Sequence, residues 1–241
     1  MQETLNTVII LAGGEGKRLR PFTEHTPKPM IPILDKPLME HMIHLLEKIG
    51  FKRVILAIGY KAGKIIDYFD KKKEEFSIKI EYSIETTPLG TGGAIRMALL
   101  KCTTEKDVLV INGDSIFIAD LNEMYKQHKK NINALVTIGV TTVEDISASG
   151  AVKLSGSVVT EFIEKPMIKK SGIINAGIYL INMAALNKFP LAEQFSFEKE
   201  FLEKECKNGT IYSYQINEFH TVNNIEQYNE MIKKLNDRRL I

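Results

Sequence analysis

The sequence predicts an α/β fold: a mainly parallel sheet flanked by helices, followed by a mixed, β-rich extension. Short Val and Ile runs alternate with longer segments of helical period up to residue 133, and this alternation is typical of βαβ units. After residue 133 the apolar runs follow one another with few helical breaks. We therefore expect a single domain over residues 1–241, with a first half at 1–133 and a β-rich second half at 134–241.

The first half contains strand-like and helix-like segments in turn. Apolar runs predict strands at residues 8–11, 54–59, 78–83 and 107–114. Apolar residues at helical spacing predict helices at residues 38–49, 61–69, 91–100 and 121–129. This alternation predicts parallel strands joined by right-handed crossover connections. The charged run at residues 71–75 is interpreted as a solvated helix end without a function.

The second half is expected to extend the sheet and then close with a helix. Its strands are expected at residues 134–140, 151–155, 157–165, 173–181 and 211–214. Helices are expected near Leu186, at residues 197–204 and at the end of the chain, where Ile225, Tyr228 and Ile232 share one stripe.

Charge and composition exclude several classes of protein. The net charge is +2, from 32 basic and 30 acidic residues, so we expect neither a nucleic-acid partner nor a membrane partner. The opening residues MQETLN lack the basic and apolar regions of a signal peptide. Cys102 and Cys206 show no metal-ligand spacing and fit reduced thiols. We therefore expect a cytoplasmic protein.

A glycine-rich loop with a basic pair follows the first strand, in the stretch VIILAGGEGKRLR. Glycines let backbone N–H groups approach an anion closely. Arg18 can grip phosphate oxygens with its fork, whereas Lys17 would act as a point charge. The loop lacks the Ser or Thr of a Walker A motif, and Leu19 stands where a dinucleotide fingerprint has its third glycine. A plain glycine-rich turn is the alternative interpretation.

Lys28 lies between Pro27 and Pro29. The two prolines restrict the backbone of this segment, so Lys28 is presented with little freedom. A lysine between prolines is usually part of a surface loop. Beside an anion-binding loop, however, Lys28 is interpreted as a second phosphate contact.

Five sequence blocks, taken in order, resemble the signature of the sugar-1-phosphate nucleotidyltransferases, also called NDP-sugar pyrophosphorylases. The chain is most similar to short members of that family, such as those that make GDP-mannose or GDP-heptose. The resemblance implies a nucleotide-diphospho-sugar transferase fold with a Rossmann-like sheet, a nucleotide-binding first half and a sugar-binding second half. The blocks lie at residues 11–19 with 27–29, 88–94, 112–114, 164–166 and 175–179.

The resemblance implies transfer of a nucleotidyl group from an NTP to a sugar 1-phosphate, with Mg²⁺ as cofactor and an NDP-sugar and pyrophosphate as products. It gives catalytic roles to Arg18, Lys28 and Asp114, with Asp114 holding the metal ion. The implied nucleotide contacts are Leu11, Ala12, Gly13, Gly14, Gly16, Lys17, Pro88, Gly90, Thr91 and Gly113. The implied sugar-phosphate contacts are Gly150, Glu164, Lys165, Asn175 and Gly177.

Local chemistry alone leaves plainer interpretations open for some of these residues. The sequence Asn112-Gly113-Asp114 suits a turn. Glu164 and Lys165 could form a surface ion pair of little energetic worth. Residues 88–94 could be only a loop and a helix start, and Gly150 could belong to an ordinary β-turn.

Thr221 stands where relatives carry a second metal-binding aspartate. A hydroxyl is a poorer ligand for a hard cation than a carboxylate. Three explanations are open: Asp114, waters and phosphates hold the metal; His220 or Asn223 compensates; or catalysis is weak. The last would fit a nucleotide-sugar-binding regulatory subunit.

Substrate identity is left open between several pairs. The resemblance favours GTP with a mannose- or heptose-type phosphate. Cytidylyl, uridylyl or thymidylyl transfer to a glucose-type phosphate, or transfer to an alcohol phosphate, is the alternative. A possible homodimer would be ordinary for a symmetric soluble enzyme.

Overall fold

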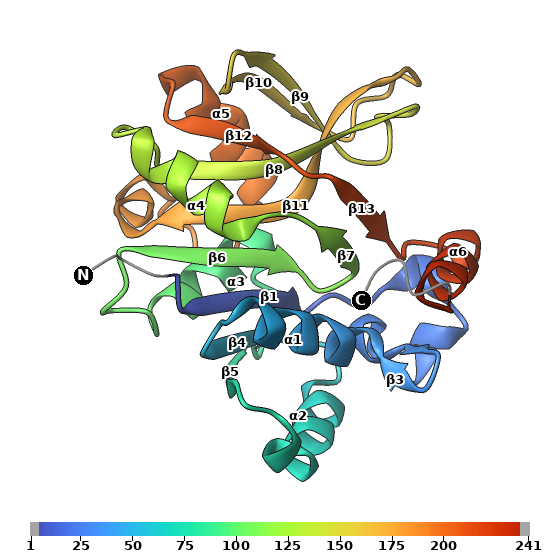
Figure 1. Cartoon of the computed structure of the whole chain (residues 1–241). Helices are drawn as coiled ribbons and strands as arrows, with labels where there is room; N and C mark the ends of the chain where they lie inside the picture. The colour runs from blue at the N-terminus through green and yellow to red at the C-terminus, as the bar shows by residue number, and fades with distance from the viewer. Residues whose placement is uncertain (1–4, 237–241) are drawn as a thin grey trace.

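A nine-stranded sheet runs through the protein (Figure 1). The computed structural model describes residues 5–236. The strand order is β5-β4-β1-β6-β11-β8-β12-β10-β9. In chain order these strands are β1 (Thr7–Ala12), β4 (Arg53–Ile58), β5 (Lys79–Ile84), β6 (Asp107–Asn112), β8 (Val136–Val143), β9 (Gly150–Ser155), β10 (Val158–Glu164), β11 (Gly172–Asn182) and β12 (Ile211–Gln215).

The first half of the sheet is parallel, as predicted. β1 pairs in parallel with β4 on one side and with β6 on the other, and β4 pairs in parallel with β5. Successive strand residues point to opposite faces, so Val8 and Ile10 enter one core while Ile9 enters the other. All three side chains are fully buried. Burial on both faces explains why the run is continuously apolar rather than alternating.

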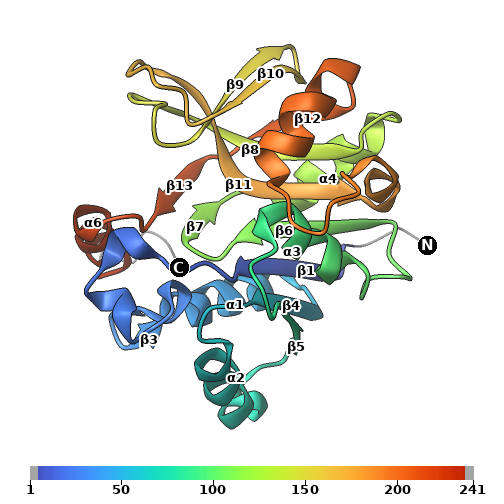
Figure 2. The same ribbon diagram turned by 180° about the vertical axis from the view of Figure 1, so that it is seen from behind.

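Helices cover both faces of this sheet, as Figures 1 and 2 show from opposite sides. Four helices contribute buried side chains to the core that contains Val8 and Ile10, and α3 contributes to the core that contains Ile9. The helix bounds agree with the predicted segments to within two residues at each end. They are α1 (Leu38–Ile49), α2 (Ala62–Lys71), α3 (Gly90–Leu99), α4 (Leu121–Lys130) and, closing the described chain, α6 (Ile225–Asn236).

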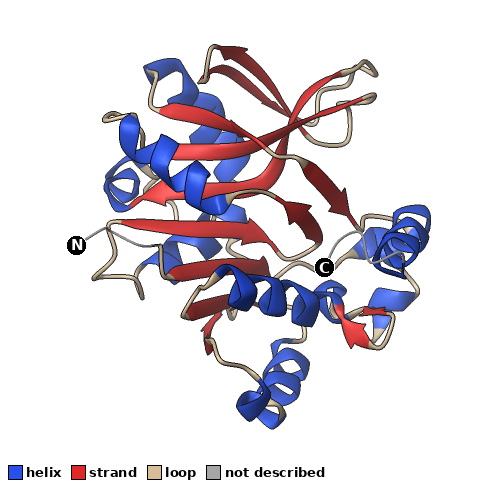
Figure 3. Cartoon of the chain, viewed as in Figure 1, coloured by secondary structure: helices blue, strands red, loops and turns tan. Residues whose placement is uncertain are grey.

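The second half extends the sheet with mixed strand directions, which confirms the predicted extension. β11 runs antiparallel to β6 and to β8, whereas β12 runs parallel to β8. β9 and β10 form an antiparallel pair at the end of the sheet, in the upper part of the view in Figure 3. Because β11 pairs directly with β6, one continuous sheet joins the two halves of the chain.

Two strands that the sequence analysis missed form a small sheet of their own. β7 (Ser115–Ile118) pairs antiparallel with β13 (Glu218–Thr221), and Thr221 lies opposite Ser115. Correspondingly, the strand predicted at residues 107–114 ends at Asn112, and Asp114 lies in the turn that leads into β7. This pairing brings residues near 221 to Asp114 across more than a hundred residues of chain. A further short pair joins β2 (Pro32–Ile33) and β3 (Lys36–Pro37).

The two helices predicted near residues 186 and 197–204 differ in type from an α-helix. The first is a 3₁₀ helix, η5 (Met183–Lys188), and the second is a π-helix, η6 (Phe197–Leu202), followed by the short α5 (Glu203–Glu205). In η6 the rings of Phe197 and Phe201 stack with centroids 5.2 Å apart. The spacing of apolar residues predicts a helix but does not distinguish these types.

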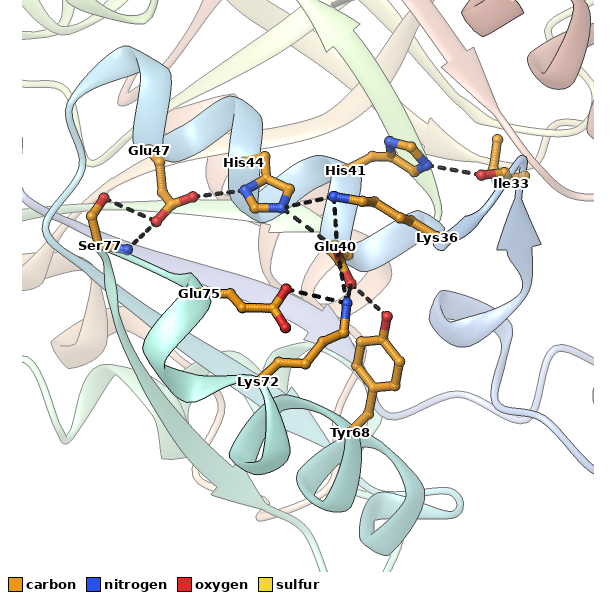
Figure 4. Close-up of polar contacts among 10 residues, drawn as sticks. All are labelled: Ile33, Lys36, Glu40, His41, His44, Glu47, Tyr68, Lys72, Glu75 and Ser77. Atoms are coloured by element: carbon orange, nitrogen blue, oxygen red, sulfur yellow. Dashed lines mark hydrogen bonds and ion pairs between the residues drawn. The ribbon is translucent and has the colours of Figure 1, made fainter.

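The interpretation of residues 71–75 as a solvated helix end is wrong for Lys72. Its ammonium lies 3.3 Å from Glu40 Oε2, and the Glu40 side chain is fully buried (Figure 4). Tyr68 and Lys36 also contact this carboxylate, at 2.5 Å and 3.1 Å. The cluster ties α1 to α2 and β3. Lys72 was missed because its partner lies 32 residues away.

His41 and His44, on α1, each contact neighbouring polar groups. His41 Nε2 contacts the carbonyl of Ile33, and His44 lies between Glu40 and Glu47 (Figure 4).

Both cysteines are buried free thiols. None of the helices in residues 5–236 combines the length and the apolar character that crossing a bilayer requires.

Candidate active site

A cavity of about 610 Å³ lies at the carboxyl ends of β1 and β6. Open parallel sheets bind ligands at this edge. The loop after β1, the start of α3 and the turn after β6 surround the cavity. Every predicted catalytic and nucleotide-binding residue lines it, namely Leu11, Ala12, Gly13, Gly14, Gly16, Lys17, Arg18, Lys28, Pro88, Gly90, Thr91, Gly113 and Asp114.

Gly16 makes the sharp bend in the loop after β1. Its φ is +64°, in the left-handed region that favours glycine. A Cβ at this position would lie 3.0 Å from both Lys28 Cβ and Thr23 Cγ2. The Thr23 hydroxyl donates to the Gly16 carbonyl over 2.9 Å. The absence of a side chain at Gly16 therefore lets the stem of Lys28 pack directly against the loop.

Lys28 and Asp114 form the closest charged pair at the cavity. Lys28 Nζ lies 2.6 Å from Asp114 Oδ2, and the Ser115 hydroxyl donates to the other carboxylate oxygen over 3.0 Å. The side chains of Lys28 and Asp114 are 12% and 29% exposed, so the pair is only partly screened by solvent. Pro27 precedes the 3₁₀ turn η3 (Lys28–Met30) that presents the lysine.

Asn223 joins this pair to Arg18. Its Oδ1 accepts hydrogen bonds from Arg18 Nη2 and from Lys28 Nζ, each over 3.0 Å. Its Nδ2 donates to the Thr221 hydroxyl oxygen over 3.0 Å, and that hydroxyl donates to the Asp114 carbonyl over 3.4 Å. The pairing of β13 with β7 therefore places a neutral Thr–Asn arrangement where a second carboxylate was expected.

The structure separates the two basic residues of the loop. Lys17 Nζ lies 3.2 Å from Glu15 Oε2, and both side chains are largely exposed. Such a pair contributes little to stability. Arg18, by contrast, points to Asn223 and the Lys28–Asp114 pair. Lys17 lies at the cavity rim and Arg18 at the charged cluster.

Asp114 offers two carboxylate oxygens at the cavity, each with one hydrogen-bonding neighbour. His220 is not placed to help, because its ring contacts Glu218 and Lys234 instead. The oxygen of Asn223 already accepts from two cations. Residues 5–236 contain no group of three or more His, Cys, Asp or Glu side chains that could hold a metal. The donor set therefore fits a hard cation whose other ligands are phosphates and water.

Glu85 is a cavity residue that the sequence analysis missed. Its Oε2 accepts a hydrogen bond from the Leu89 backbone N–H over 3.1 Å, and its carboxylate lies where a Cβ on Gly13 or Gly59 would be. The two glycines therefore make room for this carboxylate beside the loop after β1. A single glutamate after a strand has no local pattern, although its position three residues before Pro88 was available as a hint.

Three of the predicted sugar-phosphate residues lie together at the β9–β10 pair, where Gly150 begins β9, Glu164 ends β10 and Lys165 directly follows it. None of the three is among the residues that line the cavity. Gly150 lies opposite Glu164 in the strand register, and a Cβ on Gly150 would lie 3.1 Å from Glu164 Oε2. Lys165 Nζ lies 2.8 Å from Glu164 Oε1. Lys165 adopts a φ of +50°, which is uncommon for a residue with a side chain.

The other two predicted sugar-phosphate residues lie directly beside the cavity. Gly177, on β11, has a φ of +68°, and a Cβ there would overlap the side chain of Asn112, which lines the cavity. Asn175 Oδ1 accepts from the Gly177 N–H over 2.9 Å. The structure thus places Gly177, with Asn175 bonded to it, beside Asn112 at the cavity.

A chain of polar groups that passes through the buried Tyr179 connects Asn175 to Thr91. Asn175 Nδ2 donates to the Tyr179 hydroxyl over 2.7 Å, and this hydroxyl donates to Glu198 Oε1 over 3.4 Å. The other Glu198 oxygen accepts from the Thr91 hydroxyl over 2.5 Å. Burial raises the pKa of Tyr179 well above its usual value, so its proton stays available to Glu198.

The chain is similar in sequence to known proteins over most of its length. Residues 7–237 match the protein family described as Nucleotidyl transferase. The chain is 42% identical to the D-glycero-alpha-D-manno-heptose 1-phosphate guanylyltransferase of Aneurinibacillus thermoaerophilus over 86% of this chain and 87% of that protein. It is 35% identical to the mannose-1-phosphate guanyltransferase of Yarrowia lipolytica over 86% of this chain and 58% of that protein.

A solved structure has the same fold as this chain. The crystal structure of HddC from Yersinia pseudotuberculosis superposes with a TM-score of 0.82 and 31% sequence identity. The superposition covers 96% of this chain and all of that one. HddC has also been crystallised in complex with GMP-PN.

Proposed function

Because this chain belongs to the nucleotidyl transferase family, we propose that it transfers the guanylyl group of GTP to a heptose 1-phosphate, giving a GDP-heptose and pyrophosphate. The chain is a nucleotidyltransferase, and the proposal concerns its substrates and the roles of its residues. The observation that carries it is the convergence of Arg18, Lys28 and Asp114 at one cavity beside a glycine loop.

The reaction needs positioning and charge neutralisation more than covalent chemistry. An oxygen of the sugar phosphate attacks the α-phosphorus of GTP, a new P–O bond forms, and the bond to the β-phosphate oxygen breaks opposite it. Arg18 would hold the triphosphate, and Lys28 would lie between the α-phosphate and the attacking phosphate. The glycine loop would add backbone N–H groups.

Asp114 would hold Mg²⁺ together with phosphate oxygens, in keeping with its two oxygens at the cavity. The ion would neutralise charge on the phosphates. In the structure, the Lys28 ammonium donates a hydrogen bond to Asp114 Oδ2. This bond would keep the carboxylate oriented toward the phosphates with or without the ion.

Glu85 supports guanine as the base. Guanine presents two adjacent donors, N1–H and the exocyclic N2–H, and a carboxylate can accept both. Uracil and thymine present only N3–H on this edge. Glu85 lines the cavity beside Gly13, and the Leu89 N–H fixes its orientation. We expect GTP to be preferred, and Glu85→Gln to weaken that preference.

The second half of the chain, residues 134–241, would bind the sugar phosphate, and the first half would bind the nucleotide. Glu164 and Asn175 offer groups for sugar hydroxyls, and Lys165 offers a cation for the phosphate. Gly150 and Gly177 would leave room for the sugar ring. Lys165 directly follows β10 and its side chain is 58% exposed, so it is accessible to an arriving anion.

A substrate grid tests the proposal. Pyrophosphate release would be measured with Mg²⁺ for GTP, UTP, CTP, ATP and dTTP, each with heptose, mannose and glucose 1-phosphates and with phosphocholine as an alcohol phosphate. The proposal expects the highest kcat/KM with GTP and heptose 1-phosphate. A preference for mannose 1-phosphate would instead make the substrate the one named for the Yarrowia lipolytica relative. Turnover with an alcohol phosphate alone, or nucleotide binding without any turnover, would contradict the proposal.

The homodimer stays a prediction. Light scattering of the purified chain checks it directly, with a mass near twice 27.3 kDa expected for the dimer.

A further inference from the structure

The side-chain amide of Asn223 lies at the centre of the charged cluster. Its one oxygen accepts from Arg18 Nη2 and from Lys28 Nζ at equal distances of 3.0 Å. Arg18 and Lys28 come from separate 3₁₀ turns of the loop region, and Asn223 comes from the segment before α6. Among the side chains of residues 5–234, Asn223 is the one that hydrogen-bonds to both cations.

The orientation of this amide is fixed by its surroundings. Two cationic donors can only face its oxygen, so the nitrogen must point the other way. There Nδ2 donates to Thr221 Oγ1 over 3.0 Å. The backbone N–H of Asn223 donates to Gln227 Oε1 over 2.8 Å, which anchors the residue to the first turn of α6.

Lys28 and Arg18 have more N–H donors than Asp114 and Asn223 accept from. An ammonium has three N–H donors, and a guanidinium has five. Asp114 and Asn223 take two of the donors of Lys28, and Asn223 takes one donor of Arg18. The remaining N–H groups are held in fixed directions at the cavity, where an anion can accept them.

We propose that Asn223 is a positioning residue that holds Arg18 and Lys28 together as one two-cation site for a phosphate group of the substrates. The inference rests on the proposed function for the identity of that phosphate. A neutral amide suits this role, because it accepts from both cations without cancelling their charge. A carboxylate at the same place would fix them equally well but would repel the incoming phosphate.

The test measures pyrophosphate affinity and turnover separately. Calorimetry with inorganic pyrophosphate in EDTA reports on the two cations alone, without metal or nucleotide. Asn223→Ala should weaken pyrophosphate binding about tenfold, equivalent to about 1.4 kcal/mol, because both cations lose a shared partner. The matched control is Asn224→Ala, next along the chain, whose side chain accepts only from the Gln227 N–H at the start of α6.

Asn223→Asp separates positioning from charge. It keeps an acceptor for both cations, so kcat with GTP and the sugar phosphate should stay within about threefold of the wild-type value. Its added negative charge should raise the KM for GTP by about tenfold. A residue that only supports the fold would not produce this split between kcat and KM.

Several results would overturn the inference. These are pyrophosphate affinities of wild type and Asn223→Ala within twofold, an equal loss in Asn224→Ala, or no pyrophosphate binding by the wild type. Failure of the proposed function looks different: wild type would bind pyrophosphate but turn over no nucleotide with any sugar phosphate. The affinity ratio would still decide the role of Asn223.

Discussion

Glu40 is a fully buried carboxylate outside the candidate active site, with no exposed side-chain surface. Burial alone raises its pKa, but hydrogen bonds from Tyr68, Lys36 and Lys72 outweigh burial and lower the pKa to about 2. The charged form is therefore the stable one in the folded protein, and its four contacts lock α1, α2 and β3 together (Figure 4).

Glu40→Gln should lower the free energy of unfolding by about 2–3 kcal/mol at pH 7, because it leaves the surrounding cations without their shared partner. The folded pKa lies below the ordinary value of 4.5. The contribution of Glu40 is thus complete above pH 4.5 and declines as the pH falls toward 2. Urea unfolding at pH 7 and at pH 3 measures this difference.

The variant Glu74→Gln provides the control, because Glu74 is exposed in the 3₁₀ turn η4 (Lys73–Glu75) that follows α2, and its loss should change the free energy of unfolding by less than about 0.5 kcal/mol. A Glu40→Gln effect of equal size at both pH values would contradict the assignment of the stabilisation to the ionised carboxylate.

β11 is the element that connects the two regions proposed to bind the substrates. It pairs with β6, whose carboxyl end borders the cavity, and it carries Asn175 and Gly177. Tyr179 on the same strand links Asn175 to Glu198 through its hydroxyl. Its ring meets Phe197 edge to face, with centroids 5.1 Å apart. The strand therefore sets the orientation of an expected sugar contact by a partly buried hydrogen bond.

Tyr179→Phe keeps the ring packing and removes only that hydroxyl. Asn175 loses the partner that fixes its amide, so the KM for the sugar phosphate should rise five- to tenfold, while the KM for GTP changes less than twofold. Steady-state kinetics with each substrate varied in turn measures both values. Tyr212→Phe, on β12, is the matched control. Equal increases in the two KM values would count against a role for β11 in orienting the sugar.

The small β7–β13 sheet illustrates why an element can be missed in the sequence. Both strands have only four residues. Those of β13 are all partly exposed and show no clear apolar pattern, and β7 offers only the short apolar run Ile116–Ile118. Their pairing joins Ser115 to Thr221, a separation that no local window spans. The departure at Thr221 was visible in the sequence, but the use of Asn223 by two cations was not.

At the level of the whole molecule, the order of strands and helices in the first half could be predicted, because burial on both sheet faces leaves long apolar runs between helical stripes. The glycine loop, Lys28 and Asp114 could be placed at one edge of the sheet by the same reasoning. Glu85, Lys72 and the polar chain through Glu198 could not, since each depends on a partner distant in sequence.

The proposal as a whole requires one cavity in which Lys28 acts on the phosphates of two substrates. The measurement that tests it most directly is pyrophosphate release from GTP and heptose 1-phosphate by wild type, Lys28→Ala and Lys48→Ala, with folding of each checked by thermal unfolding. Lys48 is exposed on α1, away from the cavity-lining residues.

Wild type and Lys48→Ala should turn over at the same rate, and Lys28→Ala should be slower by about 10²–10³-fold, the usual effect of removing one preorganised group that stabilises charge. Turnover by a folded Lys28→Ala protein at the wild-type rate would contradict the account, because the charged cluster at this cavity would then not be where the reaction occurs.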